Sequence, residues 1–72
     1  MSNTIKRYST RSLGIVAAVQ RTPENYDYCL KWVGREELEK TKVWDYICKQ
    51  ENGNIYTVKS FHFTRNSYTE IL

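Results

Sequence analysis

The sequence is poor in the residues from which most metal, nucleotide and catalytic sites are built. Its 72 residues include one histidine, two cysteines and three glycines, and the glycines are isolated from one another. A zinc site needs about four cysteine or histidine ligands, mostly in close pairs, and a phosphate-binding loop needs clustered glycines. Neither pattern occurs, so we expect no metal and no cofactor.

A catalytic thiol is not indicated either. His62 could pair with Cys29 or Cys48 and a carboxylate, but no nucleophile motif surrounds either cysteine. The carboxylates between Glu36 and Glu39 fall on the solvated surface of an expected helix. The sequence therefore predicts a protein that is not an enzyme.

Long apolar runs are also missing. No stretch approaches the length of a membrane-spanning helix, and Met1 leads into a polar, basic segment rather than a signal-type apolar run. Two cysteines cannot build the multi-bridge framework of a small secreted protein. We therefore expect a cytoplasmic location and no membrane partner.

The charge that is present is modest and unevenly placed. The formal net charge is +3 at pH 7, and Lys6, Arg7 and Arg11 lie within residues 1–11 with no acid among them. The rest of the chain is close to neutral. This asymmetry predicts a basic N-terminal arm over residues 1–11, either flexible or an edge strand, followed by a single small domain over residues 12–72.

The strongest structural signal runs from Val43 to Phe63, VWDYICKQENGNIYTVKSFHF. Its Asn52-Gly53 pair tolerates positive φ and suits a two-residue type I′ loop, and the flanking runs are rich in strand formers. We therefore expect a central β-hairpin in which Glu51 pairs with Asn54. This register sets Ile47 opposite Val58 on one face, and Cys48 opposite Thr57 and Trp44 opposite Phe61 on the other.

Shorter patterns predict the remaining elements. We expect a strand over residues 12–20, with Gly14 at a bulge or close backbone approach, and a connection over residues 21–25. Residues 34–42 have the charge pattern of a short helix, and residues 67–72 form a last strand. In a competing interpretation this helix continues to Lys49 and replaces the first strand of the hairpin.

The segment Tyr26–Val33, YDYCLKWV, alternates between apolar and polar positions. Such alternation is typical of a half-buried strand, with one face made of Tyr26, Tyr28, Leu30 and Trp32. The elements together predict an α+β fold, a small and mainly antiparallel sheet in the order β-β-α-β-β(-β) with one short helix and the central β-hairpin. A small SH3-like barrel is the alternative.

The stretch Tyr28 to Gly34, YCLKWVG, with Trp44 further on, resembles the Y-L-V-K-W-K-G…W stretch of chromodomains. The aromatic residues of that family cage methylated lysine. The acidic and proline residues that follow the second tryptophan there are missing here, and a hairpin replaces the terminal helix. The resemblance therefore implies no function for this chain.

Aromatic residues are abundant, with six tyrosines, two tryptophans and two phenylalanines. A domain this small cannot bury them all, and interfaces favour Tyr and Trp. The sequence predicts a small non-enzymatic binding protein, an inhibitor or adaptor of a larger host protein or nucleoprotein complex, of the kind that phages and mobile elements use. A homodimer is a further option. The expected anchors are Trp44, Tyr46, Tyr56, Phe61 and Tyr68.

The alternative is a small basic nucleic-acid-binding protein. Aromatic residues of the hairpin would stack on bases, and in the expected register Lys59 lies opposite Tyr46 and Lys49 opposite Tyr56. The residues expected to contact phosphates are Lys6, Arg7, Arg11, Lys49, Lys59 and Arg65. A third interpretation is that the aromatic residues only complete a thin core, which burial of Trp32, Trp44, Phe61 and Phe63 together would indicate.

Overall fold

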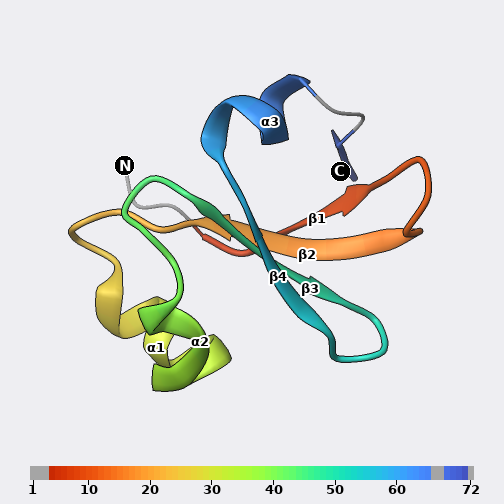
Figure 1. Cartoon of the computed structure of the whole chain (residues 1–72). Coiled ribbons are helices and arrows are strands. Elements are labelled where there is room, and N and C mark those ends of the chain that lie inside the picture. Colours follow the sequence, from red (N-terminus) through yellow and green to blue (C-terminus); the bar gives the residue numbers. More distant parts are fainter. Residues whose placement is uncertain (1–3, 66–67, 72) are drawn as a thin grey trace.

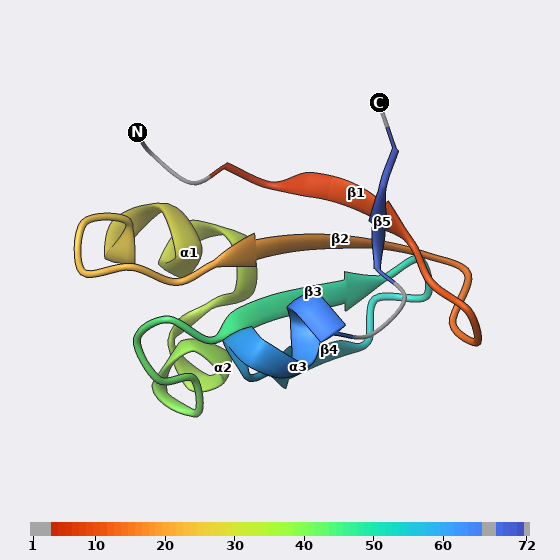
Figure 2. The same cartoon turned by 90° about the horizontal axis from the view of Figure 1, so that it is seen from above.

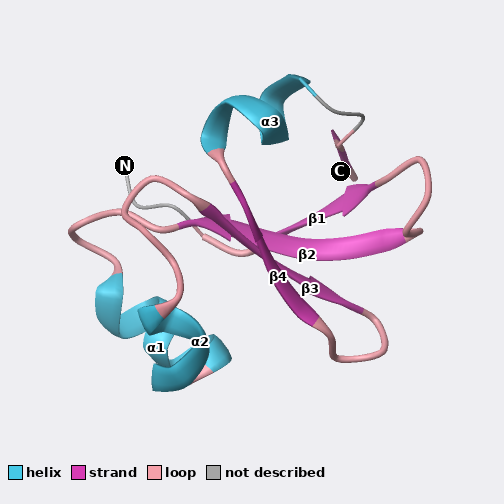
Figure 3. Cartoon of the chain, viewed as in Figure 1, coloured by secondary structure: helices cyan, strands magenta, loops and turns pink. Residues whose placement is uncertain are grey.

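The computed structural model describes residues 4–65 and 68–71. This part of the chain forms one open, five-stranded antiparallel sheet in the order β4-β3-β2-β1-β5, with three short helices (Figures 1 and 3). The predicted α+β class and mainly antiparallel sheet are confirmed, with three helices rather than one and no barrel. The elements are β1 (Lys6–Ser9), β2 (Ile15–Gln20), α1 (Tyr26–Val33), α2 (Arg35–Glu39), β3 (Tyr46–Gln50), β4 (Ile55–Val58), α3 (Ser60–Arg65) and β5 (Thr69–Glu70).

The N-terminal basic segment contributes an inner strand. β1 pairs with β2 on one side, where Tyr8 is opposite Val16, and with β5 on the other, where Tyr8 is opposite Glu70. The expectation of an edge strand is therefore wrong. Gly14 lies in the β1–β2 connection with φ of 73°, and open space surrounds it, so it serves the turn rather than a close backbone approach.

The prediction of a strand over Tyr26–Val33 is wrong, because this segment is the helix α1. The apolar residues of this segment fit the two-residue period of a strand and also the 3.6-residue period of a helix. Cys29, Trp32 and Val33 fall on one helical face and pack into the core. Asn25 begins the helix by accepting a hydrogen bond from the Cys29 N–H at 3.0 Å. The chromodomain-like stretch is thus helical and has no strand on which to present aromatic residues.

The short helix predicted over residues 34–42 is confirmed as α2. It does not continue to Lys49, because residues 40–45 form a loop and β3 begins at Tyr46. Trp44 in this loop has φ of 80°, which lies outside the helical region.

The hairpin of β3 and β4 exists, but its predicted register is wrong by one residue. Gln50 rather than Glu51 pairs with Asn54, through the Gln50 N–H and Asn54 C=O at 2.8 Å. The loop has three residues and ends in Gly53 at φ of 93°, the arrangement of a turn followed by a left-handed bulge residue. Tyr46 is therefore opposite Val58, Ile47 opposite Thr57, Cys48 opposite Tyr56 and Lys49 opposite Ile55.

The chain after β4 turns into a helix where the sequence predicts more strand. The Lys59 C=O accepts a hydrogen bond from the Phe63 N–H at 2.9 Å, and α3 follows. Trp44 and Phe61 are consequently not a cross-strand pair. The predicted last strand is confirmed as β5, although residues 67 and 72 lie outside the described part of the chain.

The sheet carries a small core on each face. Helices α1 and α2 cover one face, and α3 covers the other (Figure 1). The helix-pair core consists of Val19, Cys29, Leu38 and Ile47. The aromatic core consists of Phe63, Ala18 and Cys48 with the partly buried Tyr8, Tyr46, Tyr56, Val58 and Tyr68 around them.

Figure 2, seen from above, shows that α1 and α2 occupy only the end of the sheet where β2 ends and β3 begins. The other end of that face is left without a helix. The surfaces open to a partner are therefore this open face, the edges of the sheet and the loops.

Candidate functional site

Trp44 presents its side chain from a backbone that is held on both sides. Its N–H donates to the Arg21 C=O at 2.7 Å, and its C=O accepts from the Gln20 Nε2 at 3.0 Å. The side chain is nevertheless 54% exposed. Among the described residues it is the one non-glycine position with positive φ. Positive φ is rare for a bulky residue and persists where the surroundings impose it.

The Arg21 side chain holds the loop that contains Trp44. Its guanidinium donates through Nη1 to the carbonyl oxygens of Leu38 and Thr41 at the C-terminal end of α2. It also lies over the Tyr26 ring, with 5.4 Å between Cζ and the ring centroid. The Arg21 N–H bonds the Asp45 C=O at 2.8 Å. The loop is thus fixed to α1, α2 and the end of β2.

A second exposed aromatic residue lies on the adjoining segment. Gln20 Nε2, which bonds the Trp44 carbonyl, is also 3.5 Å from Ser60 Oγ at the first position of α3. The next residue, Phe61, is 54% exposed, and Val43 is 40% exposed. We call Val43, Trp44 and Phe61, the exposed apolar residues of the two segments that Gln20 links, the Trp44 surface. The sequence predicted Trp44 and Phe61 as anchors, and the structure leaves both available from neighbouring segments, so the four aromatic residues of the thin-core interpretation are not buried together.

The other three predicted anchors lie in the aromatic core. Phe63 stacks on Tyr46 with 3.8 Å between ring centroids and on Tyr68 with 4.4 Å. The hydroxyls of Tyr56 and Tyr68 are 2.9 Å apart. Burial, followed by this hydrogen bond, raises the pKa of Tyr56 above its usual range. These three tyrosines are therefore partly buried in the aromatic core, against Phe63 of α3.

Phe63 was missed as the centre of this packing. The sequence placed it at the end of a strand, where nothing distinguishes it from Phe61. Only the turn into α3 buries it to 6% exposure while Phe61 points outward. In a helix, residues two positions apart point to different sides, which would have separated Phe63 from Phe61. That spacing is informative only once the segment is known to be a helix.

The predicted phosphate contacts are spread over several surfaces. Lys6 pairs with Glu70 at 3.8 Å, and Lys49 Nζ donates to the Trp32 C=O at 3.2 Å while lying over the Trp32 ring. Arg11 lies in the β1–β2 connection, Lys59 directly after β4 and Arg65 at the end of α3.

The actual register also separates the basic residues from the hairpin tyrosines. Tyr46 and Tyr56 are opposite Val58 and Cys48, not opposite Lys59 and Lys49. Arg7 and Lys49 are brought together, at a groove of about 180 Å³ on the open face of the sheet, beside Ile15 and Ala17.

Both thiols are fully buried, one in each core. Burial raises the pKa of Cys48 to about 11, against a smaller opposing effect of the Tyr56 hydroxyl. Burial also raises the pKa of Cys29, and Arg21 opposes this. Neither thiol is poised to act as a nucleophile. Within residues 4–65 and 68–71, no three His, Cys, Asp or Glu side chains gather so as to hold a metal ion.

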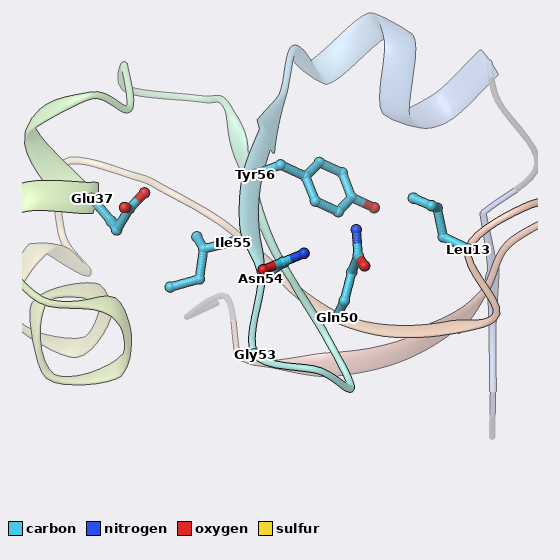
Figure 4. A pocket seen from close by; sticks show the side chains of 7 residues that line it. All are labelled: Leu13, Glu37, Gln50, Gly53, Asn54, Ile55 and Tyr56. Atoms are coloured by element: carbon cyan, nitrogen blue, oxygen red, sulfur yellow. The ribbon is translucent and has the colours of Figure 1, made fainter.

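A shallow cavity of about 550 Å³ lies along the outer edge of β4 (Figure 4). Glu37 and Ile55 lie on one side of the strand, and Tyr56, Gln50 and Leu13 lie on the other. Glu37 and Tyr56 are its titratable side chains, and they are on opposite sides. The cavity therefore offers an interaction surface rather than an acid-base pair.

Comparison of the chain with protein-family models, with curated proteins and with solved structures gives no significant match. Among the described residues, no helix has both the length and the apolar character needed to cross a bilayer.

Proposed function

We propose that this chain is a small non-enzymatic binding protein that inhibits or recruits a larger protein or nucleoprotein complex through the Trp44 surface. The observation that supports this is the state of Trp44, a half-exposed indole on a backbone with both of its peptide groups hydrogen-bonded. Such a side chain loses little conformational freedom when a partner covers it.

The chemistry of the surface fits an apolar pocket on a protein partner. Tryptophan is among the residues that contribute most to interfaces, typically about 2 kcal/mol or more when truncated. Phe61 and Val43 would extend the buried area around it, and both are exposed by 40% or more. The positive φ of Trp44 is a further support, because strained conformations concentrate at functional sites.

For the partner we propose cellular machinery of a host, with the chain acting in the cytoplasm. The support is the combination of small size, an anchoring tryptophan and buried, unreactive thiols. Compact chains of this style are common among proteins with which phages and mobile elements act on their hosts. This likeness in size and style is what links the chain to such proteins.

The test is capture of partners from bacterial lysate by the immobilised chain, compared with two variants. Trp44→Ala removes the proposed anchor. Ile71→Ala removes another exposed apolar side chain, 39% exposed, beside β5 at the opposite edge of the sheet. We expect a protein that is retained by the original chain and by Ile71→Ala but lost with Trp44→Ala.

Capture at two salt concentrations distinguishes the nucleic-acid alternative. Binding through phosphates weakens steeply as salt rises, whereas an apolar anchor is little affected. Retained nucleic acid, read by ultraviolet absorbance, that is lost at high salt and unchanged by Trp44→Ala would contradict the proposal. Equal capture of the same proteins by all three chains would contradict it too.

A further inference from the structure

The outer edge of β4 has unused backbone hydrogen-bonding groups. No strand lies beyond β4 in the described sheet. Hydrogen-bonded and non-hydrogen-bonded residue pairs alternate along an antiparallel pair of strands. Because Gln50 and Asn54 form a hydrogen-bonded pair, the backbone groups of Tyr56 and Val58 also point toward β3 and pair with it. The N–H and C=O groups of Ile55 and Thr57 consequently point away from the sheet.

This edge lacks the features that usually prevent strand pairing. Proteins block edges with proline, bulges, inward-pointing charges or very short strands. β5 at the opposite edge has two residues, whereas β4 has four, with the sequence IYTV and no charge. Thr57 at its middle is exposed. The β4 edge is therefore open to a further strand.

We propose that β4 pairs antiparallel with β4 of a second copy of the chain, about a twofold axis at Thr57. The two sheets then join into one continuous sheet. Thr57 exchanges two backbone hydrogen bonds with Thr57 of the second copy. The Lys59 N–H has no hydrogen-bond partner among the described residues. In the dimer it donates to the Ile55 C=O of the second copy.

The side chains of β4 match this register. The twofold axis places Tyr56 opposite Val58 of the second copy, and aromatic residues pair favourably with β-branched ones across strands. Thr57 lies opposite Thr57 of the second copy, another favourable pair. Every pair occurs twice except the one on the axis.

Charge complementarity favours a second copy over an unrelated peptide. Lys59 is exposed and shares the parity of Ile55 and Thr57, so in the paired sheet it lies opposite Ile55 of the second copy, on the face that carries α2. Glu37 of α2 lines the β4 cavity together with Ile55 (Figure 4). Lys59 of each copy therefore approaches Glu37 of the other copy. Within a single chain, the Glu37 carboxylate forms an ion pair with Lys40 at 3.7 Å.

The backbone part of the proposal is tested by sedimentation velocity from micromolar to millimolar concentration. Thr57→Pro removes the central outward N–H without touching the bonds to β3, and proline is tolerated at such an edge position. Thr57→Val is the matched control, because it keeps the N–H and a β-branched side chain. We expect concentration-dependent dimers for the original chain and Thr57→Val, and monomers for Thr57→Pro with an unchanged circular dichroism spectrum.

The charged pair gives a second test that does not depend on the proline variant folding. Lys59→Glu and Glu37→Lys should each weaken dimerisation at least about tenfold, because the axis repeats each ion pair. The double variant should recover most of the loss, and Lys31→Glu on α1 should have no effect.

Three results would overturn the proposal. The first is a chain that stays monomeric up to millimolar concentration. The second is a folded Thr57→Pro variant that still dimerises. The third is a double charge reversal that dimerises no better than the single variants, which would also exclude this register if Thr57→Pro fails to fold.

Discussion

Trp44 is held in a backbone conformation that its own side chain disfavours. A non-glycine residue at positive φ costs about 1 kcal/mol or more, and here the loop is fixed by hydrogen bonds from Arg21 and Gln20. Folding therefore keeps a large apolar side chain exposed and its backbone strained at one position. The binding role that we propose for the indole would account for both features.

The strain at Trp44 is measurable by comparing two truncations. Trp44→Ala and Trp44→Gly both remove the indole, but only glycine relieves the positive φ. We expect the free energy of unfolding of Trp44→Gly to exceed that of Trp44→Ala by about 1 kcal/mol in urea denaturation. A glycine variant less stable than the alanine variant would show that the conformation carries no strain.

The buried thiol of Cys48 makes stability depend on alkaline pH. Its pKa is about 11 in the fold, raised by burial from an ordinary value near 9. The raised pKa contributes stability that is fully present below the unfolded pKa and lost as pH rises through 9 toward 11.

The stability of the original chain should therefore fall relative to Cys48→Ala by about 2 kcal/mol between about pH 8 and pH 10.5. The measurement is urea denaturation of both chains across that range. The pKa values of Tyr8 and Tyr56 are raised chiefly by burial and only to a smaller extent by Cys48. Both tyrosines titrate in both chains, so most of their effect cancels in the difference. A difference that stays constant with pH would contradict the burial of the thiol.

At the scale of elements, α3 depends on one side chain. Phe63 is the buried residue of this helix, and it contacts Tyr46, Tyr68 and, edge to face at 5.0 Å, Tyr8. These contacts join α3 to β1 and β3. Because the helix has only six residues, this packing rather than its own propensity stabilises it.

The contrast between the two phenylalanines of α3 is a direct test of this packing. Phe63→Leu should lower the free energy of unfolding by about 1 to 2 kcal/mol, through loss of ring stacking and shape. Phe61→Leu, at an exposed position in the same helix, should change it by less than about 0.5 kcal/mol. Equal losses in urea denaturation would contradict the assignment of Phe63 to the core.

Elements with one dominant local signal were predictable, and those with two were not. The charges of α2 indicate a helix, and the turn residues of the hairpin indicate two antiparallel strands without fixing their register. The apolar residues of Tyr26–Val33 fit both a strand and a helix, and burial of Cys29 beside Leu38 decides between them. The hairpin register depended on loop length, since Asn52-Gly53 also fits a three-residue loop in which Gly53 is the left-handed residue.

The strength of the local sequence signals also explains which site residues could be predicted. Trp44 and Phe61 were expected as exposed anchors and are exposed. The sequence predicts Tyr46, Tyr56 and Tyr68 as further anchors, but one residue of register and the turn into α3 place them in the aromatic core. A slip of one residue moves side chains to the other face of a strand.

At the scale of the whole molecule, a thin sheet divides the apolar residues between two small cores. A chain of this size has about 3 to 5 kcal/mol of stability from its core. Two features of the fold lower this stability or leave apolar surface exposed. They are the Trp44 surface and the open β4 edge. They adjoin, because Lys59 of the proposed dimer interface lies two residues before Phe61 of the Trp44 surface.

In the proposed function, the Trp44 indole enters a pocket of a protein partner. The most direct measurement is titration of the captured partner into a Trp32→Phe variant, in which Trp44 is the one remaining tryptophan. We expect the emission of Trp44 to shift to shorter wavelength with saturation, and Trp44→Ala to bind at least about 30-fold more weakly. Saturable binding with unchanged emission, and with equal affinity for Trp44→Ala, would contradict the account.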